Sequence, residues 1–124
     1  MPNTICHFEI PAQDPKAASE FYGQLFNWTI AAGGSEYLLV QTSDRPGALG
    51  GALFSQEGEG RGVTLYVLVD SIDDTVTRLE QLGGSVVTPK AAVPQMGWTV
   101  LARDPQGNPI GLFQVDKEAA DPTT

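Results

Sequence analysis

Cysteine and histidine are nearly absent from this 124-residue sequence, which has one of each. Cys6 has no second cysteine to pair with, so an internal disulfide is excluded, and no spacing of cysteine and histidine matches a zinc-binding motif. We interpret Cys6 as a small buried apolar residue rather than a reactive thiol, because free cysteine is usually buried. The sequence therefore gives no support to chemistry that needs thiol pairs or structural zinc.

Basic residues are also few. Lys and Arg number 7 against 15 Asp and Glu, which gives a formal net charge of −8 and a pI near 4.3. A chain of this charge repels phosphate backbones, so we expect no nucleic-acid partner. The acidity fits either a well-solvated surface or the attraction of cationic ligands, and charge alone does not decide between the two.

Long hydrophobic runs are missing as well. No apolar stretch approaches the roughly 20 residues that a membrane-spanning helix needs, and the N-terminus lacks the basic and apolar segments of a signal peptide. We therefore expect a cytoplasmic protein with no membrane partner. The hydrophobic share of 41% is ordinary for a folded chain. A chain of this length buries one core, so we expect a single domain over 1–124.

The main feature that the sequence does contain is an internal repeat. A shift of 57 residues lays Asp14 on Ser71 and His7 on Thr64 without a gap. Each copy has a β-like segment, a residue suited to cap a helix, a helical pattern of apolar residues and then three more β-like segments. The later strands are expected at 28–31, 36–42 and 50–54 in the first copy, and at 85–88, 98–103 and 109–115 in the second.

This repeat predicts an α+β fold of two βαβββ modules, each a curved mixed sheet with a helix on its outer face. The modules are expected at 4–54 and 63–115. The glycine-rich, charged segment 55–62 between them is interpreted as a linker. The tail 116–124 is expected to be flexible.

Alternation along the first strand of each module predicts which side chains point away from the helix. In the first module, Phe8 and Ile10 share a face with Cys6 and are expected to pack on the helix, which leaves His7 and Glu9 on the concave face. In the second module the same rule sends Leu65, Val67 and Val69 to the helix and Thr64, Tyr66 and Leu68 to the concave face. Polar groups that face a concavity indicate a binding cleft.

Three segments of the chain resemble the vicinal oxygen chelate superfamily, which includes glyoxalase I, bleomycin-resistance proteins and extradiol dioxygenases. They are HFEIPAQDPKAASEFYGQLFNW, YVLVDSIDDTVTRLEQLGG and DPQGNPIGLFQ, and together they cover nearly the whole chain. The resemblance implies the glyoxalase/bleomycin resistance/dihydroxybiphenyl dioxygenase fold. In the metal-dependent members, four His or Glu side chains from the first and last strands of the modules hold a divalent ion that polarises the substrate.

This chain departs from that ligand set. His7 matches the first ligand position, but Thr64 stands at the second, and Gly111 stands where a glutamate is expected in the last strand. Ala52 is the counterpart of Gly111 in the first module. One imidazole holds a catalytic ion poorly, so we expect no metal and no other cofactor. A divalent metal stays the alternative, held by His7 and Glu9, with Glu36 or Gln114 as a third ligand if the register differs.

Seven residues are the candidate ligand contacts. Three roles are open for His7: a hydrogen-bonded polar residue of the cleft, a ligand contact or acid/base, or a metal ligand. Two roles are open for Glu9: a structural acid or a ligand contact. These two are also the weak catalytic candidates. The aromatic candidates are either core or pocket wall. The full set of candidate ligand-binding residues is His7, Glu9, Tyr37, Thr64, Tyr66, Trp98 and Phe113.

Three functions follow as hypotheses. The first is a binding protein for a small organic molecule in a metal-free cleft, as the resemblance to bleomycin-resistance proteins implies. The second is a metal-dependent lyase, isomerase or dioxygenase of the same superfamily with an atypical ligand set. The third is a protein-interaction domain with a vestigial cleft. Homodimerisation is expected under all three, because curved sheets of this type expose edges that pairing covers.

Overall fold

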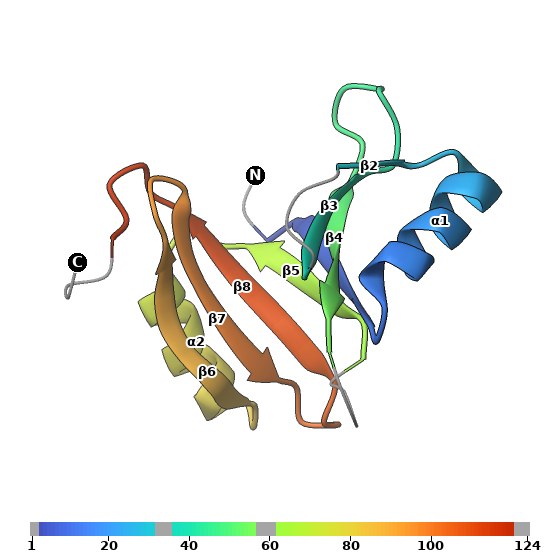
Figure 1. Ribbon diagram of the computed structural model, residues 1–124. Coiled ribbons are helices and arrows are strands. Elements are labelled where there is room, and N and C mark those ends of the chain that lie inside the picture. Colours follow the sequence, from blue (N-terminus) through green and yellow to red (C-terminus); the bar gives the residue numbers. More distant parts are fainter. Residues whose placement is uncertain (1–2, 32–35, 57–61, 121–124) are drawn as a thin grey trace. The chain divides into compact units, whose positions relative to one another are not determined.

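A computed structural model describes residues 3–31, 36–56 and 62–120 of the chain. The chain divides into an N-terminal unit, Cys6–Thr64, and a C-terminal unit that combines Met1–Ile5 with Leu65–Thr124. The element order is β1, α1, β2, β3, β4 and then β5, α2, β6, β7, β8. The predicted α+β fold with two βαβββ modules is therefore confirmed (Figure 1).

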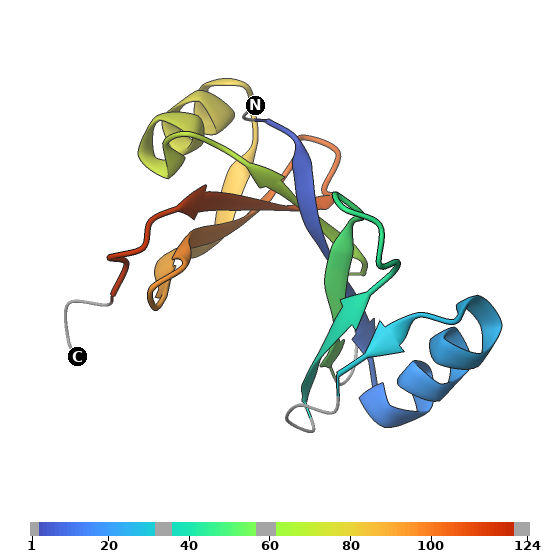
Figure 2. The same cartoon turned by 90° about the horizontal axis from the view of Figure 1, so that it is seen from above.

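The strands of the N-terminal unit lie in the order β1, β4, β3, β2. β4 is parallel to β1 and antiparallel to β3, and β3 is antiparallel to β2. Helix α1 packs against one face of this sheet (Figure 2). The bounds are β1 Ile5–Ala12, α1 Pro15–Phe26, β2 Thr29–Ile30, β3 Tyr37–Gln41 and β4 Gly50–Ser55.

Local sequence sets both ends of α1. The Asp14 side chain caps the helix by accepting the Ala17 N–H at 3.1 Å, and Pro15 fills the first helical position. Asn27 ends the helix in the left-handed region, at φ 61°. The face of α1 that meets the sheet covers a cluster of buried apolar side chains from β1, β3 and β4, namely Phe8, Leu38, Val40 and Leu53.

The C-terminal unit repeats this arrangement with the strand order β5, β8, β7, β6. β5 and β8 are parallel, and the other two pairs are antiparallel. Helix α2 covers one face over a core of Val69, Ile72, Val100, Ala102 and Leu112. The bounds are β5 Thr64–Leu68, α2 Ile72–Gln81, β6 Ser85–Val93, β7 Gly97–Arg103 and β8 Pro109–Val115.

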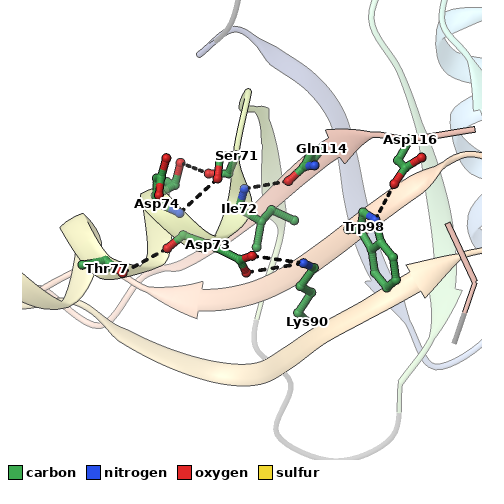
Figure 3. Close-up of polar contacts among 10 residues, drawn as sticks. Ser71, Ile72, Asp73, Asp74, Thr77, Lys90, Trp98, Gln114 and Asp116 are labelled. Atoms are coloured by element: carbon green, nitrogen blue, oxygen red, sulfur yellow. Dashed lines mark hydrogen bonds and ion pairs between the residues drawn. The ribbon is translucent and has the colours of Figure 1, made fainter. Parts of the chain in front are cut away.

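Side chains tie the start of α2 to its sheet (Figure 3). Ser71 caps the helix by accepting the Asp74 N–H at 3.1 Å. The Ile72 N–H, which has no partner inside the helix, donates to Gln114 Oε1 of β8 at 2.8 Å. Asp73, the next residue of the helix, has its carboxylate 3.4 Å from Lys90 Nζ of β6. The first turn of α2 is thus capped by Ser71 and held to two strands of the same unit, β8 and β6.

Most of the later strands end within one residue of the predicted positions, and two differences from the predictions need explanation. β6 was expected to end at Thr88, but it continues to Val93. Its pairing with β7 has two register shifts, and the one between Thr88 and Ala91 accommodates Pro89. The linker was expected from position 55, but Ser55 is the last residue of β4, and Gln56 donates its N–H to the Ala12 carbonyl. Residues 57–61 of that linker lie outside the described residues.

The expectation of a flexible tail needs correction for residues 116–120. Asp116 accepts the indole N–H of Trp98, and Ala119 is only 2% exposed. The Ala119 carbonyl accepts the Gln95 N–H from the turn between β6 and β7. This part of the tail is therefore packed on its unit.

Within the described part of the chain, neither helix has the length and apolar character to span a bilayer.

Candidate functional site

The two faces of the N-terminal sheet differ in polarity. Phe8 and Ile10 pack in the cluster beneath α1, so their neighbours in β1, His7 and Glu9, point to the other face. The predicted alternation in β1 is therefore confirmed. We call the sheet face turned away from a unit's helix the distal face. The polar side chains of β1 thus gather on the distal face.

Tyr37 of β3 joins these two side chains. Its hydroxyl donates to Glu9 Oε2 at 2.8 Å and lies 3.1 Å from His7 Nε2. Glu9 is only 8% exposed, whereas Tyr37 is 43% exposed. A nearly buried carboxylate is thus hydrogen-bonded to a tyrosine that remains accessible. The sequence marked Tyr37 as a candidate, but it did not predict that Tyr37 connects His7 to Glu9.

The strand register explains how Tyr37 reaches β1. β4 lies between β3 and β1, and its Ala52 is opposite both Glu9 and Leu39. Ala52 is fully buried and small, so the Tyr37 side chain can cross β4 at this point. A larger residue at position 52 would stand between the tyrosine and the carboxylate. The network therefore depends on three adjacent strands.

The hydrogen bonds also fix the proton positions. The Tyr37 hydroxyl has one proton, which it donates to Glu9 Oε2, so it must accept a proton from His7 Nε2. Burial lowers the pKa of His7 below 6.5, and the Glu9 charge raises it by a smaller amount. The lowered pKa favours the neutral imidazole, and the hydrogen bond to Tyr37 favours the tautomer with its proton on Nε2. The resulting chain of donors runs from His7 through Tyr37 to Glu9.

In the C-terminal unit, Tyr66 and Phe113 lie on the distal face. Val67 and Val69 pack toward α2, which confirms their predicted direction and leaves Tyr66 on the other side of β5. A Cβ placed on Gly111, the partner of Tyr66 in β8, would lie 2.3 Å from the Tyr66 ring. A Cβ on Gly97 would lie 2.7 Å from Phe113. Each ring therefore covers a glycine of a neighbouring strand.

Trp98 does not join Tyr66 and Phe113, which corrects its prediction as a cleft residue. It packs with Val100 and Ala102 on the α2 side of β7, as strand alternation requires. Its indole N–H donates to Asp116 Oδ2 at 2.9 Å, and Lys90 Nζ lies 4.8 Å from its ring centroid (Figure 3). The period-two pattern 98, 100, 102 was the signal in the sequence that identifies this side.

Thr64 begins β5 and is fully buried. Alternation places it on the same face of β5 as Tyr66. Among the described residues, its Oγ1 has no hydrogen-bond partner. Thr64 is thus a buried polar side chain at the position that the repeat matches to His7.

Comparison with known proteins identifies the family. Residues 7–113 match the model of the glyoxalase-like domain. The chain belongs to the glyoxalase-like domain family. It is also 26% identical over 116 residues to the candidate glyoxylase CFP32 of Mycobacterium bovis and of Mycobacterium tuberculosis, with 88% of this chain aligned. The match spans 44% of the length of those relatives, so the chain covers less than half of them.

Solved structures show the same fold. The Mn(II)-bound glyoxalase from Novosphingobium aromaticivorans is similar with a TM-score of 0.71 and 18% identity, over 97% of this chain and 42% of that chain. Methylmalonyl-CoA epimerase from Mycobacterium tuberculosis is similar with a TM-score of 0.66 and 18% identity, over 90% of this chain and 87% of that chain. At these identities the similarity establishes the fold of this glyoxalase-like chain and no activity.

The residues of this glyoxalase-like chain do not fit the four-ligand metal site that its resemblance implies. The strand pairs Glu9–Ala52 and Tyr66–Gly111 are equivalent in the two units, which places Ala52 and Gly111 at matching positions. Both positions lack a donor atom, and the Tyr66 ring fills the space beside Gly111. The described residues contain no group of three or more His, Cys, Asp or Glu side chains that could hold a metal ion.

The two alternative ligands do not complete the set. Gln114 points to the α2 side of β8, where its Oε1 accepts the Ile72 N–H. Glu36 precedes β3 and is exposed. Open catalytic zinc sites generally need three protein ligands, and among the described residues of the N-terminal unit only His7 and Glu9 converge. These two side chains fall short of the ligand set that a catalytic ion needs.

Proposed function

We propose that this glyoxalase-like chain binds a small organic molecule without a divalent ion, through the His7, Tyr37 and Glu9 network. The observation that carries the proposal is a carboxylate with 8% exposure on the distal face, linked by a 2.8 Å hydrogen bond to a tyrosine with 43% exposure. A ligand can reach the network at Tyr37. There it meets an acceptor whose surroundings exclude most water.

The chemistry of the network favours a ligand that donates hydrogen bonds or carries positive charge. A carboxylate can accept several hydrogen bonds at once, and the one that Glu9 accepts from Tyr37 is 2.8 Å long. Hydrogen bonds to a charged group contribute more than those between neutral groups. The formal charge of −8 on the chain acts in the same direction. An ammonium or amidinium group meets these conditions.

The surroundings favour an apolar body beside that polar group. Leu39 is 57% exposed and lies two residues from Tyr37 on the same face of β3. Small-molecule sites typically combine apolar and aromatic walls with a few polar groups. We therefore propose aromatic or aliphatic cations as the ligand class.

A binding assay with the metal removed tests the proposal. The full chain in EDTA would be titrated with phenethylammonium, with its neutral counterpart phenethyl alcohol and with metal-free bleomycin as a larger cation. We expect saturable binding of at least one cation and weaker binding of the alcohol. Glu9→Gln should weaken binding of the cation about tenfold or more, because a charge-assisted hydrogen bond is lost.

A matched control is Glu80→Gln, which makes the same chemical change on α2, in the other unit. It should leave the affinity within about twofold, since Glu80 is an exposed charge that solvent and salt screen. If none of the cations binds, or if Glu80→Gln weakens binding as much as Glu9→Gln, the proposal is wrong. Circular dichroism and thermal unfolding would verify that both variants are folded.

A metal-dependent activity stays the second candidate, because His7 and Glu9 converge on one atom, the Tyr37 oxygen. The assay above separates the two. Binding or turnover that appears only when Mn²⁺ or Zn²⁺ replaces EDTA would favour the metal-dependent lyase, isomerase or dioxygenase. Pairing with a second copy of the chain stays a prediction, to be measured by analytical ultracentrifugation.

A further inference from the structure

We propose that the Tyr37 hydroxyl takes the place of a divalent ion between His7 and Glu9. As a result, these two side chains bind ligands through hydrogen bonds and not through a metal. This inference rests on the proposed metal-independent function and assigns the residue that determines it. Tyr37 is thus a specificity-determining residue. The His7 and Glu9 side chains are present, but the atom between them is a phenol oxygen.

The distances from the Tyr37 oxygen to His7 and Glu9 support the replacement of an ion by a hydroxyl group. The Tyr37 oxygen lies 2.8 Å from Glu9 Oε2 and 3.1 Å from His7 Nε2, which are hydrogen-bond lengths. Bonds from zinc to carboxylate oxygen or imidazole nitrogen are about 2.0–2.2 Å. An ion at this place would therefore have to draw both side chains inward and displace the tyrosine. The two arrangements exclude each other.

The proton count gives the same result. Tyr37 donates its only hydroxyl proton to Glu9, so His7 Nε2 carries a proton and donates it to Tyr37. A ring nitrogen binds a metal through its lone pair, which a bound proton occupies. Metal binding at Nε2 would therefore require a change of tautomer as well as the loss of two hydrogen bonds. Tyr37 raises the free energy of that state.

In the C-terminal unit, too, a tyrosine lies where a metal-ligand side chain would be needed. Tyr66 is two residues from Thr64 in β5, as Glu9 is two residues from His7 in β1. Its ring occupies the space into which any side chain at Gly111 would extend, 2.3 Å from a Cβ built there. Each unit therefore has a tyrosine where ligand side chains for an ion would be needed. This observation is independent of the His7 network.

The proton position can be measured directly, because His7 is the only histidine of the chain. In ¹⁵N-labelled protein, long-range ¹H–¹⁵N correlation spectra report the two ring nitrogens of one residue without competing signals. At about pH 7.5 we expect the wild-type chain to show His7 in the form protonated at Nε2. Tyr37→Phe should reduce this preference, because the acceptor of the Nε2 proton is removed.

Metal titration tests the consequence. Ni²⁺ or Zn²⁺ would be added to the wild-type chain, to Tyr37→Phe and to the double variant Tyr37→Phe with His7→Gln. We expect Tyr37→Phe to bind the ion about tenfold or more tightly than wild type, since two hydrogen bonds no longer oppose it. The double variant should lose that gain. Tyr22→Phe removes a hydroxyl on the α1 side and should behave as wild type.

Two results would overturn the inference. One is a wild-type His7 protonated at Nδ1, a measurement that needs no variant and so does not depend on the folding of Tyr37→Phe. The other is a wild-type chain that binds the ion at His7 as tightly as Tyr37→Phe does. Neither result depends on cation binding in EDTA. A failure of that binding assay with the expected tautomer would instead contradict only the proposed function.

Discussion

Burial and a neighbouring acid act in opposite directions on the imidazole of His7. Burial is the larger effect and lowers the pKa of His7, while the negative charge of Glu9 raises it. The hydrogen bond from Nε2 to Tyr37 is compatible with the neutral ring. A neutral histidine adds no positive charge that would repel a cationic ligand group.

This lowered pKa predicts how stability depends on pH. Above pH 6.5 the ring is neutral in both the folded and the unfolded chain. Below 6.5, the ordinary pKa of histidine, the unfolded chain gains a proton that the folded chain does not yet bind. The free energy of unfolding should therefore fall as the pH drops below about 6.5, and level off beneath the folded pKa of His7.

Urea unfolding at several pH values between about 7.5 and 5 would measure this dependence in wild type and in His7→Gln. Glutamine keeps an N–H donor but does not titrate, so the variant should lose less stability over that range. Asp104 and Asp116 do not interfere, because hydrogen bonds hold the pKa values of both below 3.8. Equal slopes for the two proteins would show that His7 has no lowered pKa.

The composition of the site was only partly predictable from sequence. Alternation placed His7 and Glu9 on one face of β1, because that rule needs only neighbouring residues. The link through Tyr37 was not predictable, since it depends on the order β3, β4, β1 and on the small Ala52 between them. Trp98 was a candidate for either core or pocket wall, and its alternation with Val100 is the pattern that separates the two by placing it on the α2 side.

Among helices and strands, the clearest sequence signals were the caps and the turns. Asp14 and Ser71 cap the two helices, and Asp104 accepts two backbone N–H groups in the turn before β8. Those contacts are local, so the sequence predicts them. The length of β6 depended on pairing with β7 across a proline, which local pattern does not reveal. Long-range pairing therefore accounts for the misplaced strand boundary.

The close contact between β5 and β8 predicts that Gly111→Ala destabilises the chain. The new Cβ would lie 2.3 Å from the Tyr66 ring, and its nearest atoms are in the ring body rather than at a flexible end. Overpacking of this kind costs about 1–3 kcal/mol. Thermal or urea unfolding would measure the loss.

Gly23→Ala is the matched control for this substitution. A Cβ there would meet only the Trp28 carbonyl, at an ordinary 3.6 Å, and the position is helical. Alanine should therefore stabilise α1 by up to about 1 kcal/mol. Adding Tyr66→Ala to Gly111→Ala should recover part of the loss, as contacting residues are not additive. If the two changes in unfolding free energy were additive, the side chains at positions 66 and 111 would not be in contact.

The charge of the entire chain acts over longer distances than any hydrogen bond. Fifteen acidic residues against seven basic ones produce a negative potential that extends about one Debye length, roughly 10 Å at 0.1 M salt. Among the acids that the structure describes, Glu9 alone is almost fully buried. Salt screens exposed charges strongly and buried contacts much less.

This difference predicts two components in the binding of a cation. Raising NaCl from about 0.05 to 0.5 M should weaken phenethylammonium binding severalfold, because the long-range attraction is screened. Phenethyl alcohol should be nearly insensitive to salt. The ratio of affinities between wild type and Glu9→Gln should persist at high salt, since the partly desolvated contact at Glu9 is short-ranged. If high salt abolished that ratio, Glu9 would act only as one more surface charge, and a direct contact with the cation would be excluded.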